Sequence, residues 1–133
     1  MASHHFIGTG PYSDELARAA GEPRRLLDKV AAQVSEVGFE VVADNVVEFP
    51  GGGLTLVWVL AESHLVLHYW GAEGFATIDL HICDYQGSNA AKARRLLANL
   101  EAGCFLPGTA DWQTISVAEP RMPVARVPAR QVG

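Results

Sequence analysis

Serine, histidine and cysteine side chains, which together can carry out nucleophilic and acid–base chemistry, gather in one part of the chain. Ser63 is followed by His68 five residues later and by Cys83 farther along. Because side chains alternate between the two faces of a strand, strands over 64–70 and 75–83 would each place several polar side chains on one face. Two neighbouring antiparallel strands could then bring His68 and Cys83 close to each other and to Ser63.

Two general kinds of chemistry are compatible with these residues, and neither matches a known short motif. Acyl transfer would use Ser63 as the nucleophile, but the sequence lacks the Gly-x-Ser-x-Gly of a nucleophile elbow. A metal ion could be held by ligands on adjoining strands, but the His-Glu-x-x-His and Cys-x-x-Cys spacings are also missing. The candidate ligands are His64, His68, His81 and Cys83. Taken singly, such residues are more often structural, and this is the interpretation of His81 and Cys104.

The composition indicates one domain with a large apolar core. The chain has 133 residues, of which 49% are hydrophobic and 19% charged, and this low charge suggests that an oligomer buries some apolar surface. A net charge of −5 without a basic stripe argues against nucleic-acid binding. The longest apolar run, over 54–61, is too short to span a membrane, and the N-terminus lacks a secretory signal pattern. We therefore expect a cytoplasmic protein that binds neither nucleic acid nor membrane.

The apolar pattern predicts the order helix, four strands, helix, strand. The expected helices run from Pro23 to Gly38 and from Ser88 or Asn89 to Gly103, and the expected strands cover 39–49, 54–60, 64–70, 75–83 and 112–117. The first dozen residues are expected to be extended or loop, a short helix is possible over 13–20, and residues 119–133 are predicted to be a flexible tail. This order predicts an α+β fold, a two-layer αβ sandwich with a mainly antiparallel sheet and helices on one face. The other face would need cover, which points to a dimer.

A longer run of residues resembles one protein family. The segment Ala61-Glu62-Ser63-His64-Leu65-x-Leu67-His68-x-Trp70, followed by Gly74-Phe75-Ala76-x-Ile78-Asp79 and Cys83, is similar to the bacterial and archaeal S-adenosylmethionine decarboxylases. The similarity covers residues 49–83 without a gap, while the N-terminal and C-terminal thirds match only loosely. A Glu-Ser-His core with a downstream histidine and cysteine at these separations is a specific signal. A pyruvoyl-dependent decarboxylase is therefore the third and preferred interpretation.

The resemblance implies a proenzyme that cleaves itself. Ser63 would attack the carbonyl of Glu62, His68 would assist removal of the Cα proton of residue 63, and the serine would become a pyruvoyl group, so that no diffusible organic cofactor is needed. The products would be a β chain of residues 1–62 and an α chain of residues 63–133. Thr55, where the family usually has Ser, would support this processing. The pyruvoyl group would form a Schiff base with the substrate amine, and Cys83 would be the general acid that reprotonates the substrate carbon.

The resemblance also implies a substrate. S-adenosylmethionine, decarboxylated for the biosynthesis of polyamines such as spermidine, is the expected substrate. Phe49 would stack on its adenine, and Trp70 and Glu62 are further candidate binding residues. The family's ribose-binding glutamate is replaced by Ala72. The neighbouring Glu73 is expected to point elsewhere, because adjacent strand residues face opposite ways.

The lost ribose anchor at Ala72, together with Asp84 in place of a glycine of the family, motivates an alternative substrate, L-arginine or L-ornithine. Asp84 could pair with its guanidinium or ammonium group. An alternative of another class is an unprocessed, non-catalytic homologue that serves as a binding or regulatory subunit, since Thr55 could impair cleavage. The family fold dimerises through its sheet into a four-layer αββα assembly with active sites between protomers. The resemblance therefore implies a homodimer of a single S-adenosylmethionine-decarboxylase-like domain over 1–133.

Overall fold

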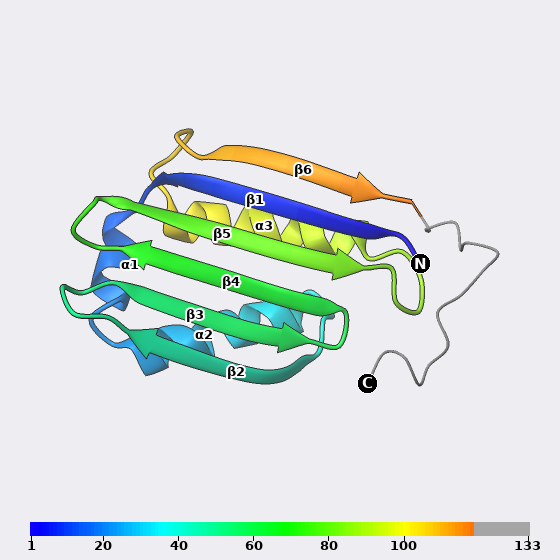
Figure 1. Cartoon of the computed structure of the whole chain (residues 1–133), viewed down its shortest axis with the longest axis horizontal. Coiled ribbons are helices and arrows are strands. Elements are labelled where there is room, and N and C mark those ends of the chain that lie inside the picture. Colours follow the sequence, from blue (N-terminus) through cyan, green and yellow to red (C-terminus); the bar gives the residue numbers. More distant parts are fainter. Residues whose placement is uncertain (119–133) are drawn as a thin grey trace, which may run out of the picture.

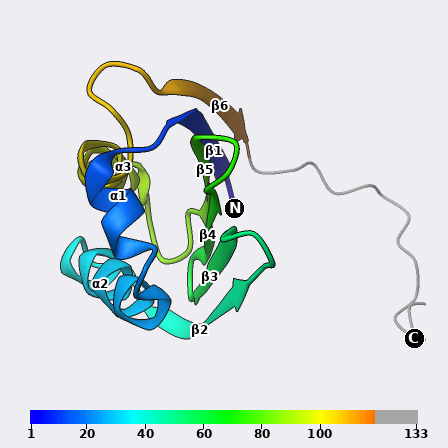
Figure 2. The same ribbon diagram turned by 90° about the vertical axis from the view of Figure 1, so that its left-hand side faces the viewer.

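A sheet and a layer of helices make up the computed structural model, which describes residues 1–118 (Figures 1 and 2). The elements are β1 (Ser3–Pro11), α1 (Asp14–Ala19), α2 (Pro23–Glu36), β2 (Val41–Glu48), β3 (Leu54–Leu60), β4 (Ser63–Trp70), β5 (Phe75–Cys83), α3 (Ala90–Cys104) and β6 (Asp111–Val117). The three helices cover the same face of the sheet (Figure 2). The predicted two-layer α+β fold is confirmed, with a sheet that is antiparallel throughout. The tail predicted over 119–133 lies outside the described residues.

The six strands lie in the order β2-β3-β4-β5-β1-β6, so the N-terminal strand sits between β5 and β6 (Figure 1). Strand β1 was expected only as extended chain or loop, because Gly8 and Gly10 weaken its strand pattern. The structure explains one of these glycines. A Cβ at Gly8 would lie 2.6 Å from the ring of Trp112 on the neighbouring strand β6, so only glycine lets this ring lie flat over β1.

The core lies between the helices and the inner face of the sheet. Helix α2 buries Leu26, Leu27, Val30 and Val34, and α3 buries Ala93, Leu96, Leu97, Leu100 and Cys104. Trp58 of β3 is fully buried beneath α2, where its Nε1–H donates to the carbonyl oxygen of Leu27 at 3.0 Å. Helix α3 continues through Gly103, where its end was expected, to Cys104. Among residues 1–118, none of the helices is long and apolar enough to cross a membrane.

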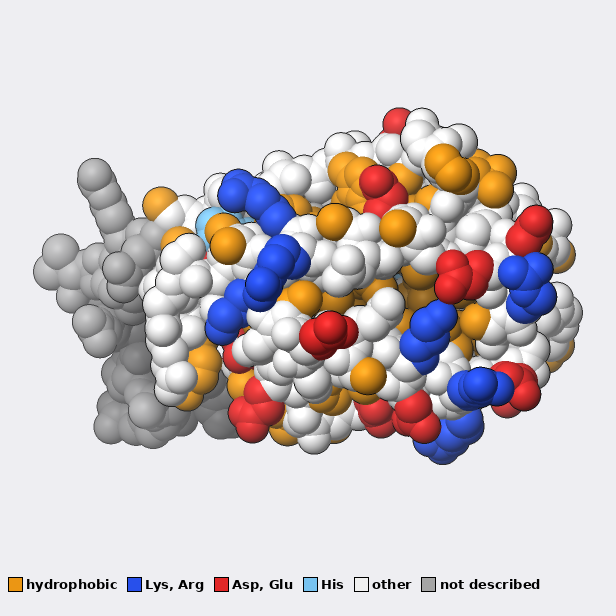
Figure 3. All heavy atoms as spheres, turned by 180° about the vertical axis from the view of Figure 1, so that it is seen from behind, with side chains coloured by type: hydrophobic (Ala, Val, Ile, Leu, Met, Phe, Trp, Pro, Cys, Tyr) orange, Lys and Arg blue, Asp and Glu red, His pale blue; other side chains and the backbone are white. Residues whose placement is uncertain are grey.

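The two outer surfaces of the molecule differ in chemistry. The helix side carries lysine, arginine, aspartate and glutamate side chains scattered over much of its area (Figure 3). No helix of residues 1–118 covers the other face of the sheet, which we call the open face (Figures 1 and 2). Strand alternation places histidines and large exposed hydrophobic residues there. The exposed hydrophobic residues include Val59, Trp70, Phe75, Ile115 and Val117.

Candidate active site

Ser63 lies at a strained point of the chain. Strands β3 and β4 form a hairpin in which Leu60 pairs with Ser63, so only Ala61 and Glu62 make the turn. Two-residue hairpin turns usually take positive φ angles within the turn, on Gly, Asn or Asp. Here the positive angle falls on Ser63, with φ of +149°. That region disfavours any residue with a Cβ, and such strain is concentrated at functional sites.

The peptide group before Ser63 is held by Cys83. The backbone N–H of Cys83 donates to the carbonyl oxygen of Glu62 at 2.8 Å. The Glu62 side chain turns away, because its Oε1 accepts the backbone N–H of Glu40 at 3.2 Å. An N–H aimed at this oxygen would stabilise negative charge on it if the carbonyl carbon were attacked.

Two imidazoles contact the Ser63 hydroxyl. The Oγ lies 3.2 Å from Nδ1 of His81 and 3.3 Å from Nδ1 of His64. Burial, and then the nearby imidazoles of His64 and His5, lower the pKa of His81 below its ordinary value, while Asp79 acts weakly in the opposite direction. Sequence reasoning treated His81 as structural, although its alternation with Cys83 along β5 was the available signal. We call Glu62, Ser63, His64, His81 and Cys83 the Ser63 cluster.

His68 does not belong to this cluster. The register pairs Ser63 with Ile82 but pairs His68 with Thr77 and Thr55. Five residues of strand separate the two by about 16 Å. The expectation that His68 and Cys83 approach each other and Ser63 within one chain is therefore wrong, because it depended on a register that the sequence does not specify. His68 Nδ1 instead lies 2.9 Å from Oγ1 of Thr55.

A pocket occupies the end of the sheet beyond His68. It has a volume of about 310 Å³ and is lined by Phe49, Pro50, Gly51, Gly53, Leu54, Thr55, Tyr69, Trp70, Ala72 and Glu73. We call it the Trp70 pocket. The Trp70 ring stacks on the His68 ring, with centroids 5.7 Å apart. Glu73 was expected to point elsewhere, but it lines the pocket beside Ala72, because both residues lie in the turn after β4, where strand alternation ends.

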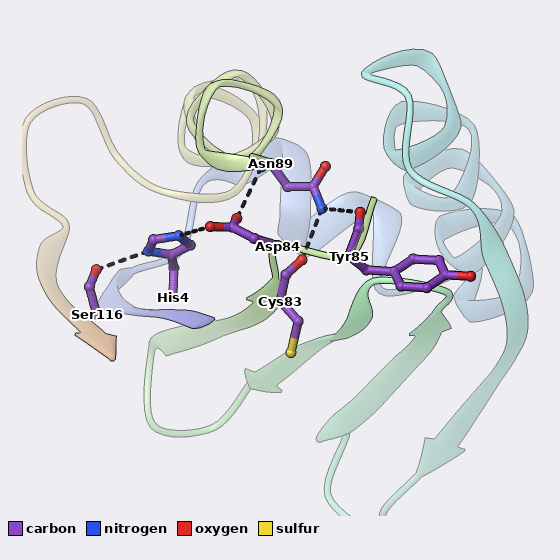
Figure 4. Close-up of polar contacts among 6 residues, drawn as sticks. All are labelled: His4, Cys83, Asp84, Tyr85, Asn89 and Ser116. Carbon is purple, nitrogen blue, oxygen red and sulfur yellow. Dashed lines mark hydrogen bonds and ion pairs between the residues drawn. The ribbon is translucent and has the colours of Figure 1, made fainter. Parts of the chain in front are cut away.

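The Asp84 carboxylate lies beside the start of α3, between Asn89 and His4 (Figure 4). Its Oδ1 accepts the backbone N–H of Asn89 at the start of α3 at 3.1 Å, and its Oδ2 lies 3.3 Å from Nε2 of His4. The hydrogen bond from Asn89, followed by the contact with His4, holds the pKa of Asp84 below its ordinary value. The Cys83 side chain points away from this network (Figure 4). Because both oxygens are occupied on the helix side, Asp84 is not retained as a substrate anchor.

The metal-site alternative is not supported. Residues 1–118 contain no group of three or more His, Cys, Asp and Glu residues arranged to hold a metal ion. Its candidate ligands are divided, since His68 lies at the far end of β4 from His64 and His81. Cys104 is buried, and burial raises the pKa of its thiol to about 12, which agrees with its structural interpretation.

Known proteins resemble this chain in sequence. The family described as S-adenosylmethionine decarboxylase matches residues 17–105. A protein of Symbiobacterium thermophilum named S-adenosylmethionine decarboxylase proenzyme is 38% identical over 77 residues, which are 58% of each chain. A Pyrobaculum aerophilum protein of the same name is 51% identical over 43 residues, or 32% of this chain and 34% of the relative. The matched segment thus spans less than two thirds of these relatives.

A solved structure matches over a greater length. The crystal structure of the adenosylmethionine decarboxylase from Aquifex aeolicus VF5 superposes with a TM-score of 0.69. The alignment covers 93% of this chain and 97% of that one, at 20% sequence identity. At that identity, the likeness shows a shared fold.

Proposed function

Since this chain belongs to the S-adenosylmethionine decarboxylase family, we propose that it is a self-processing, pyruvoyl-dependent decarboxylase that acts on S-adenosylmethionine in polyamine biosynthesis. The observation that carries this proposal is the strained Ser63 beside a carbonyl that Cys83 already holds. A serine hydroxyl, a strained backbone and a donor on the preceding carbonyl oxygen are what cleavage of the 62–63 bond requires. The proposed chains are residues 1–62 and 63–133 of one domain.

Processing would proceed through atoms of Ser63 itself. The Ser63 Oγ attacks the Glu62 carbonyl carbon, and the backbone N–H of Cys83 stabilises the charge that develops on the oxygen. The C–N bond then breaks to leave an ester. Removal of the Cα proton of residue 63 expels the Glu62 carboxylate from Cβ and leaves dehydroalanine, which tautomerises, takes up water and releases ammonia. The resulting pyruvoyl group supplies a carbonyl that accepts the electrons released by decarboxylation. The Cys83 thiol, on the open face, would donate a proton to the substrate carbon.

Removal of the Cα proton requires a base, and we propose that a second protomer supplies this base. His68 lies about 16 Å along β4 from Ser63 in its own chain. Two open faces packed against each other would bring the Thr55–His68 pair of one protomer to the Ser63 cluster of the other. The exposed apolar residues of the open face support such a homodimer, whereas the charged helix side suits solvent. Thr55 retains the hydroxyl that contacts His68, which supports processing despite the change from the family's Ser.

The Trp70 pocket favours S-adenosylmethionine over the alternative substrates. Phe49 and Trp70 offer aromatic faces to a purine, and Glu73 offers a carboxylate that could accept ribose hydroxyls in place of the missing glutamate at Ala72. Arginine or ornithine was motivated by Ala72 and Asp84, and both carboxylate oxygens of Asp84 are occupied elsewhere. The two aromatic faces favour a flat purine ring over an aliphatic side chain.

Intact-mass measurement tests this proposal. The purified chain should yield fragments of residues 1–62 and 63–133, the second with a blocked N-terminus, whereas Ser63→Ala should remain at 14.3 kDa. A wild-type chain that stays whole would contradict the proposal and favour the non-catalytic homologue. Release of CO₂ from S-adenosylmethionine, arginine and ornithine, assayed side by side, then tests the substrate.

A further inference from the structure

We propose that His81 is the general base that activates the Ser63 hydroxyl for self-cleavage. This inference rests on the proposed function and assigns the step that precedes the one given to His68. Its basis is a contact with a reacting atom, because His81 Nδ1 lies 3.2 Å from Ser63 Oγ. A base at this distance can take the proton directly.

The backbone fixes this contact. His81 lies directly across from His64 in the β4–β5 pairing, next to the pair formed by Ser63 and Ile82. The neighbouring N–H of Cys83, also on β5, holds the Glu62 carbonyl. One end of β5 therefore presents both a base for the attacking hydroxyl and a donor for the oxygen that becomes charged. Groups carried by a regular strand hold their positions better than groups on a loop.

The surroundings of His81 favour its neutral, proton-accepting form. His64 on β4 and His5 on β1 face it, each with a ring centroid 5.3 Å away. Asp79 and Cys83 are its neighbours on the same face of β5, and Asp79 is bound to His5. Burial and the two flanking imidazoles lower the pKa of His81, which favours the neutral ring, and in the tautomer with its proton on Nε2 the Nδ1 atom can accept the serine proton.

The two contacts of the hydroxyl are mutually compatible. Ser63 has one proton to donate and can also accept hydrogen bonds. If His64 donates its Nδ1–H to Oγ, the serine proton points to Nδ1 of His81. That proton then moves to His81 as Oγ bonds to the Glu62 carbonyl carbon. When the C–N bond breaks, His81 returns the proton to the departing nitrogen, so the step consumes nothing and regenerates the neutral imidazole.

The rate of ester formation measures this role. Newly synthesised chain, labelled in cell-free translation and followed with time, should cleave about 100-fold or more slowly in His81→Asn than in wild type. His4→Asn makes the same change on the helix side of β1 and should cleave at the wild-type rate. Wild-type cleavage within the same experiment tests the proposed function separately.

Hydroxylamine separates the two histidine roles, because it cleaves an ester but not an amide. His68→Asn should accumulate the ester and release the 1–62 fragment when hydroxylamine is added. His81→Asn should release about 100-fold less over the same time, because it forms the ester that much more slowly. A His81→Asn chain that cleaves at the wild-type rate, or that accumulates ester, would overturn the proposal while leaving the proposed function intact.

A measurement on the wild-type chain tests the proposal even if the His81→Asn variant does not fold. Ester formation should slow as pH falls through the His81 pKa, below the ordinary histidine value of about 6.5, because protonated Nδ1 cannot accept the proton. A rate that stays constant from about pH 8 to about pH 5 would contradict a histidine base.

Discussion

The Ser63 cluster and the Trp70 pocket lie at the two ends of β4 and use the same open face for different purposes. At the Ser63 end, two imidazoles contact the hydroxyl of a strained residue, and a backbone N–H holds the carbonyl before it. At the other end, aromatic rings border a hollow of about 310 Å³, and a histidine is paired with a hydroxyl. The first region is arranged to break a bond and the second to hold a ligand. Under the proposed function neither region suffices alone, and a second protomer would complete the site.

Mixing two inactive variants tests whether the two regions meet between protomers, and the expected change in cleavage is the largest. Ser63→Ala lacks the nucleophile and His68→Asn lacks the proposed base for Cα, so neither should cleave alone. When the two are refolded together in equal amounts, about half of the dimers should be mixed, and each mixed dimer contains one complete site. The His68→Asn chain, identified by its mass, should then be cleaved.

The same mixture also provides the contradicting outcome. If refolded wild-type chain cleaves but the mixture yields no fragments, the two regions do not meet between protomers. Size-exclusion chromatography of the mixture checks that the chains associate.

Replacing Cys83 by alanine separates its backbone role from its side-chain role. Cys83→Ala keeps the N–H that donates to Glu62, so self-cleavage should continue. Decarboxylation should fall about 100- to 10,000-fold, because the substrate carbon loses its acid. Fragment masses and kcat measure the two effects. Cys104→Ala, which alters the buried cysteine, should leave kcat unchanged, and an equally unaffected Cys83→Ala would refute the assignment.

The sequence predicted local elements well and long-range pairing poorly. The strands over 54–60 and 75–83 and the helix from Pro23 follow from apolar periodicity and a favourable first residue, which are local properties. Strand β1 was missed because its two glycines weaken the strand pattern, and one of them, Gly8, is explained only by a ring on another strand. The local sequence pattern thus indicates which helices and strands form, but it says little about which strands pair.

In the candidate site, too, the residue types could be predicted from the sequence, whereas their contacts could not. The resemblance identified Ser63 and Cys83 as a pair, and the structure brings both to one end of the sheet. His68 was placed near Ser63, and the contact of His81 with Ser63 was not predicted, because both depend on register and a strand's neighbours cannot be read from its own residues. Asp84 was assigned to the substrate because its contacts with Asn89 and His4 are not visible in the sequence.

Replacing Ser63 by glycine tests the strain that distinguishes the Ser63 end. Ser63→Gly and Ser63→Ala both lack the hydroxyl and should stay whole, so their stabilities can be compared. Glycine adopts φ of +149° freely, and Ser63→Gly should therefore be more stable than Ser63→Ala by about 1–3 kcal/mol in urea unfolding. At Ser116 in β6, which has no such angle, the same pair should show the opposite order. Equal stabilities at residue 63 would argue against stored strain.

Removing one hydroxyl tests how His68 is positioned at the other end. Thr55→Val keeps the shape of the side chain but loses the contact with His68 Nδ1 at 2.9 Å. The lost hydrogen bond would stabilise the orientation of the imidazole by about 1 kcal/mol, so conversion of the ester to fragments should slow about fivefold. Thr55→Ser should keep the rate, and hydroxylamine should release more fragment from Thr55→Val than from either. A normal rate in Thr55→Val would make this hydroxyl dispensable.

The smallest expected effect concerns Asp84, which lies beside Cys83 in the chain but outside both regions. Asp84→Asn can still accept the Asn89 N–H but loses its charge near His4 and the start of α3. In a Ser63→Ala background, unfolding at pH 7 should therefore cost about 0.5–1 kcal/mol less free energy. Because the folded-state pKa is lowered, this stabilisation is present above the ordinary Asp pKa and is lost as pH falls through the lowered value. In the processed enzyme, Asp84→Asn should leave turnover of S-adenosylmethionine unchanged. If Asp84→Asn instead lost turnover of arginine or ornithine, Asp84 would be a substrate-binding residue.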